Sequence, residues 1–224
     1  RVLGGGSSIN GQVANRGAPN DYSIWEERGA KDWNWDKVLP YFKKVERDMD
    51  FEGPLHGNKG RIPVSRTFPE LWNGHVKATA QAFKSIGFKY LEDQNGKFED
   101  GYFPVTGSHV YERRVSAAVG YLDPTTRHRS NLTIMTDTHV TRLIFDGMKC
   151  LGVAAESKGK EMEYMAKEVI LSSGAIHSPT HLLRSGIGPS MDLKDLGIDV
   201  KLNLPGVGQR LMDHPSAVSY THLR

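Results

Sequence analysis

Residues 168–179 read Glu-Val-Ile-Leu-Ser-Ser-Gly-Ala-Ile-His-Ser-Pro, and the predicted fold class depends mainly on them. The apolar run 169–171 indicates a strand, small residues follow it, and a helix is expected to begin near Pro179. Open α/β sheets bind nucleotides where a strand ends and a helix begins, because unpaired amide groups and the positive end of the helix dipole lie there. The stretch therefore favours an α/β fold, and an ordinary strand-to-helix turn is the alternative interpretation.

The residues before this stretch predict a small antiparallel meander. Apolar and polar residues alternate from Asn131 onward, and a strand is expected over residues 140–145. Asp146 and Gly147 have the composition of a hairpin turn, after which residues 151–155 form the returning strand. A further turn at Gly159 then precedes the last strand of the meander, over residues 168–171, which runs into Ser172.

The first half of the chain predicts short helices, one strand and loops. Residues 36–47 predict a helix with Asp36 as its N-cap, and a strand is expected over residues 61–65. A second helix is predicted by apolar residues at helical spacing from Val76 to its stop at Gly87. A local aromatic core is expected from Trp25, Trp33, Trp35, Tyr41 and Phe42.

The composition of the chain is that of a globular protein. Its 224 residues suffice for one large domain or two small ones, with 38% hydrophobic residues, 25% charged residues and a net charge of +3. Basic residues alternate with acidic ones, as in residues 43–47, so no nucleic-acid partner is expected. No apolar run approaches the ~20 residues that a transmembrane helix needs. The single Cys150 excludes an internal disulfide, and we expect a cytoplasmic location, with periplasmic or membrane-peripheral locations left open.

The chain opens on a glycine-rich run, residues 1–11, which reads Arg-Val-Leu-Gly-Gly-Gly-Ser-Ser-Ile-Asn-Gly. Consecutive glycines let backbone amides approach a flat or anionic ligand, and serine and asparagine side chains add hydrogen bonds. The run matches neither the lysine-containing phosphate loop nor the dinucleotide pattern G-x-G-x-x-G. Spacing alone favours a flexible loop slightly over a cofactor contact.

Two other candidates give no site from spacing alone. Gly206 and Gly208 lack the third glycine of a dinucleotide fingerprint, so residues 204–215 are interpreted as a loop. The adjacent Asp213 and His214 cannot both face one ligand from an extended backbone. Histidines 177 and 181 lie four positions apart, yet no third ligand accompanies them, and no metal site is predicted.

Together, the runs 1–10, 174–188 and 204–215 resemble, in the same order, the two signatures and the following loop of the glucose-methanol-choline (GMC) oxidoreductases. The resemblance covers essentially the whole chain and is strongest for the choline-dehydrogenase-like branch. It implies an FAD flavoprotein of the α/β class, with a partial Rossmann-like FAD-binding domain, an antiparallel β-meander and part of an α+β substrate-binding domain. Family landmarks between the runs are Trp25, Pro40-Tyr41-Phe42, His56-Gly57, Arg114-Val115-Ser116-Ala117-Ala118 and Tyr121-Leu122.

The resemblance also assigns parts of the chain to domains and to the cofactor. It implies a flavin-wrapping loop and helix over 1–45, part of the substrate-binding domain over 46–130 and the rest of the FAD-binding domain over 131–217. Residues 218–224 match nothing in the family and are interpreted as a tail of non-native origin. The residues expected to contact FAD are Val2, Gly4, Gly5, Asn10, Gly11 and Val13 around the flavin and pyrophosphate, Val140 at the adenine, Gly174 and Ala175 at the phosphate and ribose, and Asp213 and His214 near the isoalloxazine.

Three positions depart from the family pattern. Gly6 replaces a frequent serine, and His181 replaces an aliphatic residue. Ile9 stands where some choline-oxidising members carry a histidine bonded covalently to the flavin, so non-covalent FAD is expected. The family's G-x-G-x-x-G segment and its catalytic histidine are expected outside this chain, in a longer reading frame. No catalytic residue is therefore assigned, and the fragment alone is expected to be inactive.

The function implied by the resemblance is oxidation of a primary or secondary alcohol, choline-like or other, with hydride transfer to flavin N5. Oxygen or a quinone would then accept the electrons. Two alternatives remain open. Hydroxynitrile lyases share the scaffold and hold FAD without redox turnover, and a non-catalytic flavin-binding remnant would show the same motifs.

Overall fold

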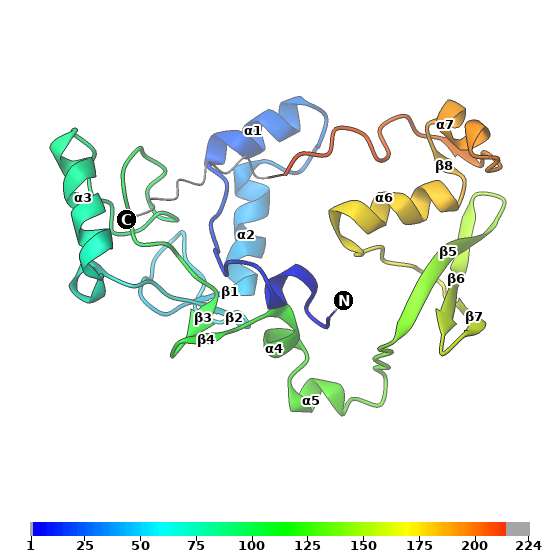
Figure 1. The fold of residues 1–224 in the computed structure, drawn as a ribbon, viewed down its shortest axis with the longest axis horizontal. Helices are drawn as coiled ribbons and strands as arrows, with labels where there is room; N and C mark the ends of the chain where they lie inside the picture. The colour runs from blue at the N-terminus through cyan, green and yellow to red at the C-terminus, as the bar shows by residue number, and fades with distance from the viewer. Residues whose placement is uncertain (1, 214–224) are drawn as a thin grey trace, which may run out of the picture. The chain divides into compact units, whose positions relative to one another are not determined.

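The computed structural model describes residues 2–213 and divides the chain into two compact units, residues 1–134 and 135–224 (Figure 1). The predicted boundary between the substrate-binding part and the following FAD-binding part lies at residues 130 and 131. Whether the two units are those functional parts stays a prediction. The predicted tail, residues 218–224, lies outside the described residues.

The first unit consists of short helices around small pieces of sheet. Strand β1 (Glu46–Asp48) pairs in parallel with β2 (Ile62–Val64), inside the strand predicted over 61–65. Strands β3 (His109–Val110) and β4 (Arg113–Arg114) form a tight hairpin. The helices of this unit are η1 (Gly5–Ser8), α1 (Pro19–Glu27), α2 (Trp35–Val45), η2 (Pro69–Leu71), α3 (Gly74–Ser85), α4 (Ala117–Tyr121) and α5 (Pro124–Arg127).

The helix predicted over 36–47 exists as α2, but its N-cap is not Asp36. The side chain of Asn34 accepts a hydrogen bond from the backbone N–H of Lys37 at 3.1 Å, and Asp36 lies in the first turn. An N-cap side chain must reach the amide three residues on, which Asn34 does here. The helix ends at Val45, because the chain turns there into β1.

Helix α3 confirms the second predicted helix, with Gly87 in the left-handed region at φ 95° just beyond its end. Helix α1 was not predicted from the sequence. Its signal is Pro19 in the first turn followed by Asp21, whose carboxylate accepts a hydrogen bond from Ala18 N–H at 2.8 Å.

The aromatic core between α1 and α2 is centred on Tyr22. The Tyr22 ring lies 5.4–5.9 Å from the rings of Trp25, Trp35 and Phe42, measured between centroids. Tyr41, which the sequence analysis placed in this core, is instead 69% exposed. It points outward because the inner face of α2 carries Val38 and Phe42.

The second unit is built on the predicted meander. Strands β5 (Thr138–Asp146), β6 (Lys149–Ser157) and β7 (Lys160–Met165) pair antiparallel in that order, with Gly147 and Gly159 at positive φ in the two turns (Figure 1). The remaining elements are α6 (Gly174–Arg184), β8 (Ile187–Gly188), α7 (Ser190–Asp195) and β9 (Leu202–Asn203), of which β8 and β9 pair in parallel.

Two sequence predictions about this unit are wrong. The third meander strand is β7 and not residues 168–171, because the turn at Gly159 returns the chain directly into register with β6. Residues 168–171 pair with no strand among residues 2–213, and Ile170 is 82% exposed. Helix α6 begins at Gly174, so Pro179 lies inside it. The alternation after Asn131 forms no strand before Thr138.

The overall class is mixed α/β, as predicted. Across residues 2–213, every helix is too short or too polar to cross a bilayer.

Candidate functional site

The glycine-rich segment, residues 2–13, is called the glycine loop below. It turns sharply because Gly4 and Gly5 adopt φ values of 87° and 54°. A Cβ atom on Gly4 would lie 2.5 Å from Ser8 Oγ and 3.1 Å from the backbone nitrogen of Ala118. The loop therefore needs glycine at position 4 for both its conformation and its packing on α4.

Polar contacts hold the inner side of the glycine loop. The Ser7 hydroxyl accepts a hydrogen bond from Ala117 N–H at 2.9 Å. Arg114 donates to the Ser7 carbonyl at 3.1 Å and to Asn10 Oδ1 at 2.9 Å. Asn10 Oδ1 also accepts from Gln12 N–H at 3.0 Å, so the Asn10 side chain fixes the loop to itself and to β4.

The outer side of the glycine loop is apolar and open. Val2, Ile9 and Val13 are 55%, 79% and 51% exposed. A Cβ atom on Gly5 or Gly6 would meet no atom within 4 Å. Exposed aliphatic side chains beside bare backbone make a surface that suits the face of a planar ring system, and the residues present therefore fit a flavin.

The predicted cofactor residues fall into two groups, one in each unit. Val2, Gly4, Gly5, Asn10, Gly11 and Val13 share the glycine loop. In the second unit, Val140 pairs with Ala155 in the meander, and Gly174 and Ala175 open helix α6, where Gly174 has φ 84°. Asp213 is exposed, and His214 lies outside the described residues. The assignment of all these residues to FAD stays a prediction.

A cavity of about 640 Å³ adjoins the end of the glycine loop. Gly11 and Gln12 line one part of it, and the rest is formed by helix α3 with the residues before it and by residues 102–109. Its wall includes the aromatic side chains of Trp72, Phe83, Tyr102 and Phe103, aliphatic residues such as Leu71 and Val76, and polar residues such as His75 and His109. His109 Nδ1 is 2.9 Å from the Ser65 hydroxyl.

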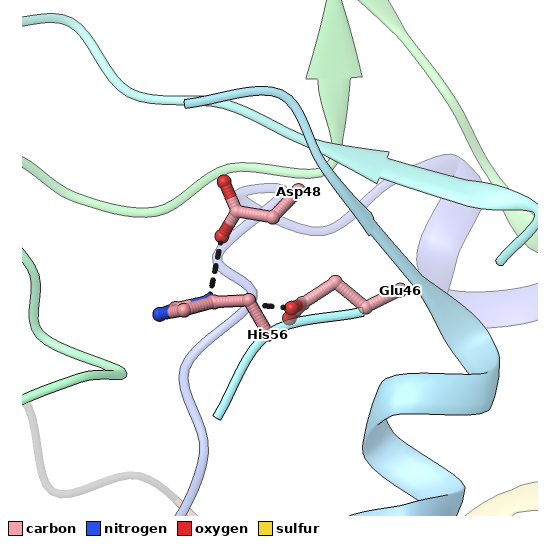
Figure 2. A group of neighbouring side chains, drawn as sticks. All are labelled: Glu46, Asp48 and His56. Carbon is pink, nitrogen blue, oxygen red and sulfur yellow. Dashed lines mark ion pairs between the residues drawn. The ribbon is translucent and has the colours of Figure 1, made fainter. Parts of the chain in front are cut away.

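A buried ion cluster in the same unit was missed by the sequence analysis. Figure 2 shows the ion pairs that His56 makes with Asp48 and Glu46. His56 Nδ1 lies 3.0 Å from Asp48 Oδ2 and 3.5 Å from Glu46 Oε1. On the other side of the ring, His56 Nε2 lies 2.9 Å from Asp93 Oδ2. The His56 side chain is only 6% exposed. Arg66 donates to both carboxylate oxygens of Asp48, at 2.9 and 3.0 Å, and to Asp93 at 2.7 Å.

The cluster holds a proton on His56. Contacts with Asp48, then with Asp93 and Glu46, raise the pKa of His56 to about 11. Burial works against ionisation of Asp48, but His56 and Arg66 outweigh it and hold the pKa of that carboxyl well below its usual range. His56 is therefore an imidazolium at neutral pH.

Glu46, Asp48 and His56 offer three ligand atoms within 4.8 Å of one another, a spacing that a metal ion could use. Two arginines occupy the same carboxylates, however, since Arg16 contacts Glu46 at 2.5 Å and Arg66 holds Asp48 with both nitrogens. Positive charge is thus already supplied, and a cation would have to displace it. The cluster is better described as a buried network of ion pairs, with a protonated histidine at its centre, than as a metal centre.

The sequence did contain a signal for this cluster in the glycines that follow it. A Cβ on Gly57 would lie 2.0 Å from the Lys43 carbonyl, and one on Gly60 would lie 2.1 Å from the Val45 carbonyl. The loop that carries His56 therefore packs closely against the end of α2 and the start of β1. Gly57 and Gly60, which the sequence indicated only as loop residues, stand where two backbones approach each other.

His181, the other buried histidine of interest, belongs to the packing of α6. Its side chain is buried, and burial, followed by the charge of Arg184, lowers its pKa. Among the described residues, its Nδ1 atom has no hydrogen-bond partner. The interpretation from the sequence that His177 and His181 bind no metal stays a prediction.

Comparison with known proteins identifies the family. The model of the GMC oxidoreductase family matches residues 1–216. The chain is 46% identical over 217 residues to 5-(hydroxymethyl)furfural oxidase of Methylovorus sp. strain MP688, covering 96% of this chain and 41% of that protein. It is 41% identical to oxygen-dependent choline dehydrogenase of Staphylococcus xylosus, covering 96% of this chain and 38% of that protein.

Solved structures agree with this result. Pyridoxine 4-oxidase from Mesorbium loti superimposes with a TM-score of 0.83 at 30% identity, over 89% of this chain and 39% of that structure. The chain thus spans about two fifths of the length of the relatives it matches. The matched family and its solved relatives are FAD-binding flavoproteins. The chain belongs to the GMC oxidoreductase family, and its cofactor is FAD.

Proposed function

We propose that this chain is the flavin-wrapping and partly substrate-lining section of a longer enzyme that oxidises a primary alcohol. The observation that carries the proposal is the open apolar side of the glycine loop, which ends at Gly11 and Gln12 in the wall of the aromatic cavity. A substrate in that cavity would lie beside a flavin bound against the glycine loop. Bound FAD supplies the hydride acceptor, flavin N5.

The residues that would hold FAD are those of the two groups described above. Val2, Ile9 and Val13 would exclude water from one face of the ring, while Gly4 and Gly5 keep the backbone close to it. Ile9 carries no nucleophilic atom, so we propose that the flavin is bound non-covalently at this position. The base that takes the hydroxyl proton would be supplied by a part of the enzyme outside residues 2–213.

Among alcohols, we propose a hydroxymethyl group on an aromatic or heteroaromatic ring. The rings of Trp72, Phe83 and Tyr102 in the cavity suit stacking against such a substrate. The names of two similar proteins, 5-(hydroxymethyl)furfural oxidase and pyridoxine 4-oxidase, support this choice over choline. Oxygen is the proposed electron acceptor, and the cytoplasmic location expected from the sequence stays a prediction.

The test uses the full-length protein that carries this segment. It is mixed without oxygen with 5-(hydroxymethyl)furfural, with an aryl alcohol and with choline, and the visible flavin absorption is followed. We expect the two aromatic alcohols to bleach the flavin faster than choline does, and air to restore the colour without an added quinone. Flavin that no alcohol bleaches, together with rapid cleavage of a cyanohydrin, would assign the protein to the lyases. If the protein carries out neither reaction, it is a non-catalytic flavoprotein.

A further inference from the structure

One buried side chain connects residues 14–16, which follow the glycine loop and are called its exit below, to the rest of the first unit. Asn95 is fully buried, with 0% of its surface exposed. Its Oδ1 accepts a hydrogen bond from Arg16 N–H at 3.0 Å, and its Nδ2 donates to the Ala14 carbonyl at 3.0 Å. The side-chain amide therefore pairs with the backbone of residues 14–16 in the way that a neighbouring strand would.

Asn95 is itself fixed by the buried ion cluster. Its backbone N–H donates to Asp93 Oδ1 at 3.1 Å, and Asp93 Oδ2 lies 2.9 Å from His56 Nε2. Arg16 closes a ring from the other side, because its Nη2 donates to Glu46 at 2.5 Å and Glu46 lies 3.5 Å from His56 Nδ1. His56 is thus connected to the exit of the glycine loop by two routes, one through Asp93 and Asn95 and the other through Glu46 and Arg16.

The same segment is also held by backbone contacts with residues 106–108. Ala14 N–H donates to the Thr106 carbonyl at 2.8 Å, and Ser108 N–H donates to the Gln12 carbonyl at 2.7 Å. Residues 12–16 are therefore held by two sets of hydrogen bonds, and the Asn95 side chain alone supplies one of the two sets. Loss of Asn95 would leave the buried Arg16 N–H and the partly buried Ala14 carbonyl without these partners.

We propose that Asn95 is a positioning residue for FAD, which holds the exit of the glycine loop in the conformation that receives the cofactor. The inference rests on the proposed function, since the glycine loop must be the FAD contact for its position to matter. If the loop is already fixed before FAD binds, no binding free energy is lost in ordering it, so FAD binds more tightly. Asn95 touches no part of the open side of the loop and would act only through residues 14–16.

The test compares two asparagine variants in the full-length protein. Asn95→Leu keeps the approximate size of the side chain and removes both hydrogen bonds. Asn34→Leu is the matched control, because Asn34 also accepts from a backbone N–H and donates through Nδ2, yet it caps α2 away from the glycine loop. Both variants should lower the thermal midpoint of the flavin-free protein, but only Asn95→Leu should raise the Kd for FAD, by about tenfold.

A second measurement reports on position without any flavin. Amide hydrogen exchange over residues 2–16 should be faster in flavin-free Asn95→Leu than in wild type and unchanged in Asn34→Leu. If Asn95→Leu does not fold, Arg16→Lys takes its place: it keeps the charge, weakens the contact with Glu46, and should show the same two changes to a smaller degree.

The outcomes separate the two proposals. If wild type binds FAD and the Asn95 and Arg16 variants bind it as tightly, with unchanged exchange over residues 2–16, the positioning role is overturned and the proposed function stands. If wild type binds no FAD, both proposals fall together. Weaker FAD binding with faster exchange in Asn95→Leu, and neither change in Asn34→Leu, supports the role of Asn95.

Discussion

The glycine loop and the buried ion cluster lie in the same unit and are built on opposite principles. The loop leaves apolar side chains exposed and space open beside Gly5, whereas the cluster buries Asp48, His56 and Arg66 among one another. Open apolar surface is suited to a ligand, and buried charges that are paired with one another are suited to fixing one conformation. We therefore propose that the loop binds the cofactor and that the cluster stabilises the unit, and substitutions can test each role.

The largest expected effect comes from removing the charge at the centre of the cluster. His56→Leu would leave the carboxylates of Glu46, Asp48 and Asp93 with only the two arginines, so we expect a loss of about 3–5 kcal/mol in the free energy of unfolding. Chemical denaturation of the full-length protein measures it. His128→Asn is the control, because His128 is exposed at the end of α5, and it should cost less than about 0.5 kcal/mol. Equal stability of the two variants would contradict the role assigned to the cluster.

A smaller loss is expected where the loop of His56 meets the end of α2. Gly57→Ala would place a methyl group 2.0 Å from the Lys43 carbonyl, and separating the two backbones should cost about 1–3 kcal/mol. Gly74→Ala, at the first turn of α3, meets no atom within 4 Å and should be neutral or slightly stabilising. Thermal unfolding of both variants checks this; a Gly57→Ala protein as stable as Gly74→Ala would show that the close approach is relaxed in solution.

The cluster also predicts a dependence of stability on pH. The pKa of His56 is raised from 6.5 to about 11, so its contribution is complete below pH 6.5 and is lost as the pH rises through that window. The loss is at most about 1.4 kcal/mol per pH unit, because one proton is involved. The pKa values of Glu46, Asp48 and Asp93 are lowered, so their contribution is present above their unfolded values and is lost in acid.

Denaturation midpoints between pH 7 and 10 measure the alkaline side of this dependence. Wild type should lose stability steadily over this range, and His56→Gln should show a flatter profile because it has no proton to lose. A wild-type profile as flat as that of the variant would show that His56 is neutral in the folded protein.

The two regions also differ in how far the sequence predicts them. The glycine loop is contiguous, so together with the runs 174–188 and 204–215 it indicated the family by resemblance, although its own spacing favoured a flexible loop. The cluster joins residues from 16 to 93 that meet only after β1 and β2 pair, and no local pattern states that pairing. Helix starts failed for a similar reason: whether Asn34 or Asp36 caps α2 depends on which side chain reaches the Lys37 amide.

The meander shows the same limit at the level of strands. Alternation and the turn at Gly147 located β5 and β6, because a two-residue turn fixes the register of the strand that follows. Residues 168–171 are as apolar as a strand, but a strand also needs a paired neighbour, and the sequence of the segment does not say whether one is available. The strand predicted over residues 168–171 was therefore wrong because the segment has no paired strand among the described residues, although its composition is that of a strand.

The smallest expected change in stability belongs to the glycine loop. Asn10→Ala removes the acceptor for Arg114 and for Gln12 N–H, both near solvent, so unfolding should change by less than about 1 kcal/mol. Retention of FAD by the full-length protein should nevertheless weaken by about tenfold, because the loop must then be ordered when the cofactor binds. Asn20→Ala, on the exposed side of α1, is the control and should alter neither quantity. The comparison fails if Asn10→Ala retains FAD as well as Asn20→Ala does, or if it destabilises the protein as much as His56→Leu.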